Sequence, residues 1–290
     1  MKQILIASDL SEKSGPALQR AVALARQFGS RLTVVHVLDE GSPPTEFDHE
    51  RSRVLAALRE ELRRAGGDHL GTAAVPSIAV GDPSSAIADA ADRLEADLVV
   101  MGRPAQGGLG GLIGGTTVRR VMGLGARPVL MVNEAGEAPY SKVLAAIDLS
   151  DASANALRTA RILGLLDPSR DAAVHGFLPL GEGMMYYAGI EREKIDDHVA
   201  VSASQARQAV SRFLRKYGFE KLENFLLVEK GTPFEAIQEG IDRVEADLLV
   251  IGTRGHGGFK RVLLGSVADE VIQGVRCDVL AVPPSDKSVK

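Results

Sequence analysis

Two patterns of apolar residues alternate along the chain. Short apolar runs such as ILIAS and LTVVHVL are typical of buried strands, whereas longer segments repeat apolar residues every three to four positions, as helices do. Ser14 suits the start of the first helical segment and Gly29 its end. The pattern predicts strands at 4–8, 32–38, 75–80, 97–102 and 128–132, and helices at 14–29, 48–65, 83–94 and 116–125.

The second part of the chain repeats this order. ILIASDLS near the start corresponds to VLAAIDLS at 143–150, and residues 81–132 align with 231–282 without a gap. The second copy is longer between its second and third strands. Its pattern of apolar residues predicts strands at 143–148, 172–177, 224–229, 248–251 and 279–282, and helices at 153–165, 190–218, 233–244 and 266–274. We therefore expect two tandem domains, 1–135 and 140–285, joined through NEAGEAPY at 133–140.

Alternating strands and helices, with strands apolar on both faces, predict an α/β fold with a parallel sheet covered by helices on each side. Ligands of such sheets bind beyond the carboxyl ends of the strands. The last strands, 128–132 and 278–282, are strongly apolar. Pairing them would cover two exposed edges at once, which predicts an internal pseudo-dimer of the two domains. Further association into a homodimer is left open.

Composition narrows the functional classes. The 290 residues carry a net charge of −4, which disfavours a general nucleic-acid binder. The single cysteine, Cys277, excludes an intrachain disulfide, and no Cys/His spacing indicates a metal site. The N-terminus lacks a signal-peptide pattern and no apolar run is long enough to span a bilayer, so we expect a cytoplasmic protein without membrane contact.

A glycine-rich segment, GTRGHGGFKRVLLGS, follows the fourth strand of the second copy, with the spacing Gly252-x2-Gly255-x9-Gly265-Ser266. Glycines let backbone N–H groups approach an anion, and the free N–H groups of a helix starting at Ser266 favour phosphate. The segment lacks the GK[ST] of a P-loop, and it follows the fourth strand rather than the first, unlike a Rossmann fingerprint. Further candidate glycines and nearby cationic side chains are Gly257, Gly258, Arg254, His256, Lys260 and Arg261.

This spacing resembles the ATP-binding signature of the universal stress protein family. Three other features resemble that family too: the opening strand that ends in Asp148-Leu-Ser, His175 at the end of the second strand, and the closing DVLAVP. The resemblance implies a Rossmann-like, five-stranded parallel sheet of the adenine nucleotide alpha hydrolase type in each domain. It also implies an ATP, ADP or AMP ligand, with Mg²⁺ accompanying a triphosphate. Asp148 and the backbone around Gly176 would hold adenosine, and Gly252, Gly255, Gly265 and Ser266 would hold phosphate.

The first copy departs from the signature. It has Ala105 where the second copy has Gly255, and Pro104 removes a backbone donor. Glycines also replace Lys260 and Arg261. The second site is therefore expected to bind more tightly than the first. The corresponding candidates in the first copy are Asp9, Val37, Gly102, Gly115 and Thr116.

Several of these residues also have structural interpretations. Asp9 and Asp148 suit turns or helix caps. His36 and His175 are expected to be packed or backbone-bonded rather than catalytic, and Cys277 is expected to be inert. The segment 176–200, which contains Met184, Met185, Tyr186 and Tyr187, either covers the core or serves as a lid or partner surface.

These observations favour a nucleotide-binding stress-response regulatory protein and assign no catalytic residue. One alternative is a slow ATPase, for which His256, Asp269 and Glu270 are the candidate bases. The other alternative is a nucleotide-free interaction module that uses residues 176–200 to bind unknown protein partners.

Overall fold

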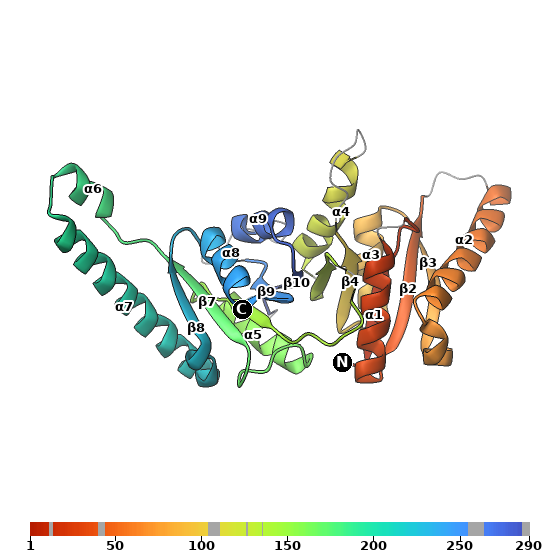
Figure 1. Ribbon diagram of the computed structural model, residues 1–290. Helices are drawn as coiled ribbons and strands as arrows, with labels where there is room; N and C mark the ends of the chain where they lie inside the picture. Colours follow the sequence, from red (N-terminus) through yellow and green to blue (C-terminus); the bar gives the residue numbers. More distant parts are fainter. Residues whose placement is uncertain are drawn as a thin grey trace.

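The ten strands in the described part of the chain form one continuous sheet (Figure 1). The computed structural model describes residues 1–11, 14–39, 44–103, 111–125, 127–134, 136–254 and 264–285. The strand order is β3-β2-β1-β4-β5-β10-β9-β6-β7-β8, so each half contributes five adjacent strands in the same relative order. The strands are β1 (Gln3–Ala7), β2 (Arg31–Leu38), β3 (Ala74–Val80), β4 (Leu98–Gly102), β5 (Val129–Val132), β6 (Val143–Ala146), β7 (Ala172–Phe177), β8 (Leu226–Lys230), β9 (Leu248–Gly252) and β10 (Asp278–Val282).

Helices cover both faces of the sheet, as the sequence predicts. One face packs against α1 (Ser14–Phe28), α2 (Pro44–Arg64), α5 (Asp151–Ile162) and α7 (Arg192–Tyr217). The other face packs against α3 (Pro83–Arg93), α4 (Gly111–Leu124), α8 (Pro233–Val244) and α9 (Ser266–Gly274). The remaining helical segments are α6 (Glu182–Tyr187) and the 3₁₀ turns η1 (Gly67–Ala73) and η2 (Glu220–Phe225).

Strand residues alternate between the two cores, because successive side chains of a strand point to opposite faces. Ile4 and Ile6 join the core under α1, whereas Leu5 joins the core under α3 and α4. Each core contains buried residues from both halves. The chain therefore buries its apolar side chains in two layers that run across the whole sheet.

The predicted pairing of the last strands is confirmed. β5 and β10 pair antiparallel, with Leu130 opposite Leu280, whereas every other neighbouring pair in the sheet is parallel. This pairing joins the two five-stranded halves edge to edge and leaves β3 and β8 as the outer strands.

Three helices differ most from the sequence prediction. α2 begins at Pro44 rather than at 48, and α4 begins at Gly111 rather than at 116. The sequence pattern also missed α6, a short helix with no buried residue and therefore no apolar face to mark it. Gly189 follows the end of α6, and its φ of 68° lets its N–H and that of Ile190 donate to the carbonyl oxygens of Tyr186 and Met185.

None of the helices in the described part of the chain is both long enough and apolar enough to cross a bilayer.

Candidate functional site

The same turn follows the first strand of each half. After β1, Asp9 Oδ1 accepts hydrogen bonds from the Ser11 backbone N–H (2.9 Å) and the Ser14 hydroxyl (2.9 Å). After β6, Asp148 Oδ1 accepts from the backbone N–H (3.0 Å) and the hydroxyl (2.5 Å) of Ser150. Both aspartates are exposed at the carboxyl edge of the sheet, where the sequence analysis placed them. The turn interpretation of these two residues is confirmed.

A leucine with left-handed backbone follows each aspartate. Leu10 has a φ of 61° and Leu149 a φ of 65°. A side chain with a Cβ rarely adopts this region, which costs about 1–2 kcal/mol. Both leucines pack against the core, so tertiary contacts hold the strained turn in place. Strain repeated at the same place in both halves marks the end of this strand as a candidate functional position.

The carboxyl group of Asp9 stays ionised well into the acid range. Partial burial opposes ionisation, but the hydrogen bonds from Ser11 and Ser14 outweigh it and lower the pKa of Asp9 below 3.8. The pocket beside it therefore presents a negative charge at neutral pH.

The two histidines support the backbone of this edge. Nδ1 of His36 lies 2.9 Å from the carbonyl oxygen of Ser8, and Nδ1 of His175 lies 2.7 Å from that of Ile147. This confirms the expectation of backbone-bonded histidines. Each ring links the end of the first strand to the end of the second.

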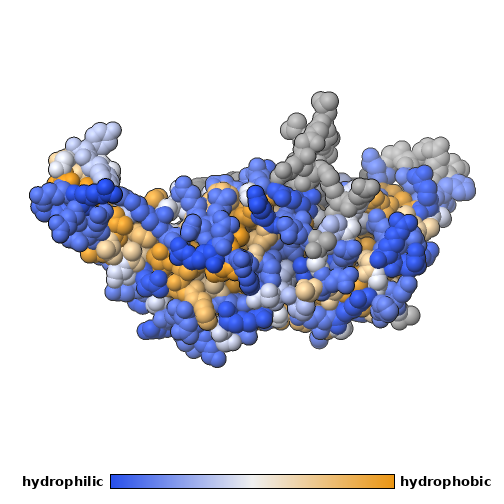
Figure 2. Space-filling view, in the orientation of Figure 1, coloured by the Kyte–Doolittle hydropathy of each residue, from blue (hydrophilic) through white to orange (hydrophobic). Residues whose placement is uncertain are grey.

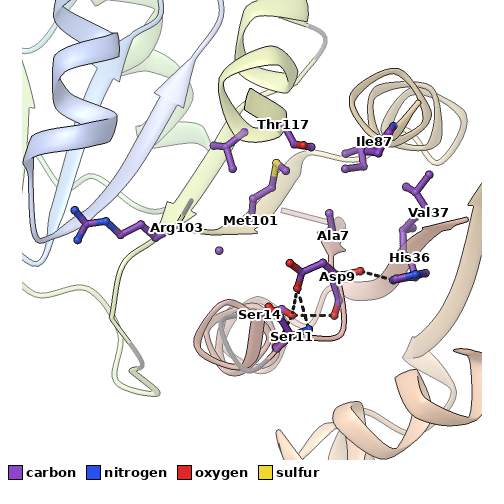
Figure 3. A pocket seen from close by; sticks show the side chains of 15 residues that line it. Ala7, Asp9, Ser11, Ser14, His36, Val37, Ile87, Met101, Arg103 and Thr117 are labelled. Carbon is purple, nitrogen blue, oxygen red and sulfur yellow. Dashed lines mark hydrogen bonds between the residues drawn. The ribbon is translucent and has the colours of Figure 1, made fainter. Parts of the chain in front are cut away.

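The first half contains a cavity of about 250 Å³ at this edge (Figure 3). Asp9 and Ser14 line it from the β1 turn and the start of α1, Val37 from the end of β2, and Gly102 from the end of β4. Ile87 and Met101 add apolar walls. Apolar walls with a few convergent polar groups suit a small ligand that combines a flat ring with hydroxyl groups, and the cavity is slightly smaller than most drug-sized pockets.

Arg103 connects this cavity with the second half of the chain. Its side chain extends away from Asp9 (Figure 3), and its Nη2 donates to the carbonyl oxygen of Gln273 in α9, at 3.3 Å. A further contact between the first and second halves of the chain is the ion pair of Arg119, in α4, with Asp269, in α9.

In the second half, the two ends of the glycine loop lie together. The N–H of Gly265 donates to the carbonyl oxygen of Thr253, at 2.9 Å, which places the start of α9 beside the end of β9. A Cβ on Gly265 would approach that oxygen to 3.3 Å, and a Cβ on Gly252 would approach the backbone of Ala152 to 3.2 Å. Gly265 is the N-cap and Ser266 the first residue of α9, as predicted. Gly255, Gly257, Gly258, His256, Lys260 and Arg261 lie outside the described residues.

Gly176 lies where β7 meets the start of α8. A Cβ there would lie 3.0 Å from the Cβ of Ala236 and 3.2 Å from the carbonyl oxygen of Thr232. Thr232 and Glu235 form a capping box, in which each side chain bonds the backbone of the other residue, and this fixes the first turn of α8. The strand end predicted to face adenosine is thus held rigidly by a neighbouring helix.

One prediction for the first half is wrong in its local structure. Gly115 and Thr116 were expected to open a helix, but they lie inside α4, which begins at Gly111. A glycine inside a helix costs only about 1 kcal/mol, so Gly114 and Gly115 do not stop it. The two halves therefore differ here, because α9 does begin at Ser266.

Two of the three candidate bases for ATP hydrolysis, Asp269 and Glu270, lie in the described part of the chain. Asp269 is engaged by Arg119 from the other half and accepts a hydrogen bond from the Gln273 side chain, at 3.2 Å. Glu270 is exposed, and His256 lies outside the described residues. Within the described ranges, no cluster of three His, Cys, Asp or Glu side chains could hold a metal ion.

Comparison with known proteins identifies the family of this fold. The model of the universal stress protein family matches the chain twice, over residues 1–133 and 139–283. The chain belongs to the universal stress protein family. The resemblance and the tandem α/β fold inferred from the sequence are both confirmed.

Individual relatives are more distant. Universal stress protein E of Escherichia coli K12 is 29% identical over 164 residues, which cover 55% of this chain and 47% of that protein. This chain thus aligns with about half the length of that relative. Universal stress protein MJ0531 of Methanocaldococcus jannaschii is 30% identical over 156 residues, 52% of this chain and 87% of that protein. The crystal structure of a universal stress protein from Archaeoglobus fulgidus covers 98% of both chains with a TM-score of 0.62 at 18% identity, which supports the fold alone.

Within this family fold, the sequence analysis undervalued two contributors to the site. Ser14 was expected only to start a helix, yet it also donates to Asp9, and Arg103, which had no predicted role, contacts Gln273. A signal for the serine was present, since Ser11-x2-Ser14 recurs as Ser150-x2-Ser153. The contact of Arg103 with Gln273 joins residues far apart in the sequence, and no local pattern predicts it.

Proposed function

We propose that this chain binds an adenine nucleotide at the carboxyl edge of its second half and acts as a stress-response regulatory protein of the cytoplasm. The observation that carries the proposal is the hydrogen bond from Gly265 to Thr253, because it closes the glycine loop on itself beside the end of β9. Nucleotide occupancy, rather than rapid turnover, would set its conformation or its choice of partner.

The phosphates are assigned to the start of α9. Its first N–H groups have no partner inside the helix, and the helix dipole adds partial positive charge there. The hydroxyl of Ser266 is in the first turn and can donate to a phosphate oxygen. Arg254, next to Thr253, adds positive charge where the loop leaves β9.

The nucleoside is assigned to the ends of β6 and β7. Asp148 provides carboxylate oxygens for ribose hydroxyl groups, and the backbone at Gly176 is held close by α8. The first-half cavity supports this assignment, since the equivalent strand ends there combine a carboxylate with apolar walls. Binding at the first-half candidates Asp9, Val37, Gly102, Gly115 and Thr116 is proposed to be weaker, because that copy lacks the complete loop.

Thermal unfolding with a ligand series tests the proposal. A ligand that binds only the folded state raises the unfolding temperature according to its concentration and Kd. We expect adenosine, AMP, ADP and ATP with Mg²⁺ to give increasing shifts for the wild type. Ser266→Ala should flatten the increase from adenosine to ATP while retaining the adenosine shift.

Thr116→Ala is the matched control, because Thr116 aligns with Ser266 in the first half. It should leave the ligand series close to that of the wild type. Equal loss in both variants, or no shift with any ligand at millimolar concentration, would contradict the assignment of phosphate to α9.

A second candidate function rests on an exposed apolar surface. We call residues 178–201 the arm; it contains α6 and the start of α7 and projects beyond β8 (Figure 1). Figure 2 shows apolar side chains near its tip. Leu180 is 88% and Tyr187 97% exposed. Solvent exposure of such side chains is typical of a protein-interaction surface.

Substituting both residues with serine tests the arm as an interaction module. Neither side chain packs against the core, so the fold should persist. Loss of a cross-linked protein partner, with nucleotide-induced shifts unchanged, would support the module, and capture of the same partner by the variant would rule it out.

A further inference from the structure

The β5–β10 pairing is centred on a local two-fold axis. Leu130 lies opposite Leu280, and the neighbouring pairs Val129–Ala281 and Met131–Val279 follow in order. Leu130 and Leu280 are counterparts in the alignment of 81–132 with 231–282. A two-fold axis brings only the positions beside it close to their own counterparts, so residues beside the axis decide which halves fit together.

One pair of counterpart positions beside the axis carries opposite charges. Arg119 of α4 and Asp269 of α9 are also counterparts in the alignment, and they form an ion pair. Their side chains are 44% and 27% exposed, and α4 and α9 lie side by side on one face of the sheet (Figure 1). Two first halves would bring two arginines together at this position, and two second halves would bring two aspartates together.

A second ion pair between the two halves lies on the other face of the sheet. Nε of Arg20 in α1 is 3.4 Å from Oδ2 of Asp278 in β10, and the side chains are 10% and 3% exposed. The aligned counterparts are Thr159 for Arg20 and Pro128 for Asp278, neither of which is charged. Pairing of like halves would leave Arg20, or Asp278, buried without its ionic partner, which is strongly unfavourable.

We propose that the surface formed by α4 and β5 is selective for an unlike half. It accepts the α9 and β10 surface of the same chain or of a second copy, and it disfavours another first half. The first half contributes the cations Arg119 and Arg20, and the second contributes the anions Asp269 and Asp278. Charge thus directs the two copies of a duplicated fold to pair with each other rather than with their own kind.

Charge reversal in the full chain tests this proposal. Arg119→Asp places two aspartates at the axis, as two second halves would, and Asp269→Arg places two arginines there, as two first halves would. We expect each single variant to lower the urea midpoint of unfolding at low salt. The double variant Arg119→Asp, Asp269→Arg restores an opposite pair and should recover most of the loss.

Arg120→Asp is the matched control. Arg120 is the neighbouring residue, but it pairs with Asp82 inside the first half, at 3.1 Å. This variant also loses an ion pair, so it should lower the midpoint by itself, but Asp269→Arg should not rescue it. A double variant of Arg119 and Asp269 as unstable as the sum of its single changes would overturn the proposal, as would equal rescue of the Arg120 variant by Asp269→Arg.

Discussion

At the scale of residues, the turns after β1 and β6 combine a carboxylate that accepts hydrogen bonds with a leucine in left-handed backbone. The hydrogen bonds to the carboxylate stabilise the turn, and the turn places the carboxylate at the edge of the sheet. A change at this aspartate therefore alters both local stability and the candidate ligand contact.

Asp9→Asn separates charge from hydrogen bonding, because an amide oxygen can still accept from Ser11. The lowered pKa of Asp9 means that its ionised form stabilises the fold above pH 3.8 and that this contribution is lost as pH falls through the lower, folded-state pKa. We expect Asp9→Asn to be less stable than the wild type at pH 7, with the difference shrinking towards pH 3. Urea unfolding at both pH values measures this, and a difference that grows on acidification would contradict it.

Cys277 gives a second test at this scale. Burial, together with the nearby Asp278 charge, raises the pKa of its thiol to about 12. At pH 8 only about one thiol in ten thousand would be ionised, and the thiolate is the reactive form. We expect a disulfide reagent to label the native protein far more slowly than the urea-unfolded protein. Equal labelling rates would show that the thiol is accessible and activated.

At the scale of elements, helix ends set the positions of the strands that carry the site. α3 and α8 are both followed by a glutamate in left-handed backbone, Glu95 with a φ of 50° and Glu245 with a φ of 51°. Glycine is the residue that best suits this position after a helix.

Glu95→Gly should therefore stabilise the protein by about 0.5–1 kcal/mol, the left-handed cost less the added flexibility of the unfolded chain. Asp89→Gly, at an exposed position inside α3, is the control and should destabilise by about 0.3 kcal/mol, because glycine is a poorer helix former than aspartate. Opposite shifts of the urea midpoint are expected. Destabilisation by both changes would show that Glu95 makes a contact worth more than its backbone strain.

Elements with strong periodicity were predictable from the sequence, and the remainder depends on tertiary contacts. The ten strands and the start of α9 follow from apolar runs and the Gly265-Ser266 pair. α6 has no buried face, so apolar spacing could not reveal it. The start of α4 was misplaced at Thr116, because glycines are poor helix formers and yet Gly111, Gly114 and Gly115 lie inside this helix. The contacts of Arg103 and Arg119 with α9 depend on how the halves meet, which no local pattern shows.

At the scale of the whole molecule, the two halves share both cores and one sheet. We expect one cooperative thermal transition for the full chain, with equal calorimetric and van't Hoff enthalpies. Leu280→Ala removes a fully buried side chain at the junction and should destabilise by about 2–5 kcal/mol. Two resolved transitions in the wild-type calorimetric scan would show that the halves unfold independently.

Calorimetric titration with ATP and Mg²⁺ measures whether the glycine loop of the second half binds a nucleotide. The wild type is compared with a Gly255→Ala, Ser266→Ala variant of the second-half loop. We expect binding near one equivalent in the wild type and loss of that binding in the variant. No binding at millimolar ATP, or equal binding by both proteins, would contradict the assignment of the nucleotide to this loop.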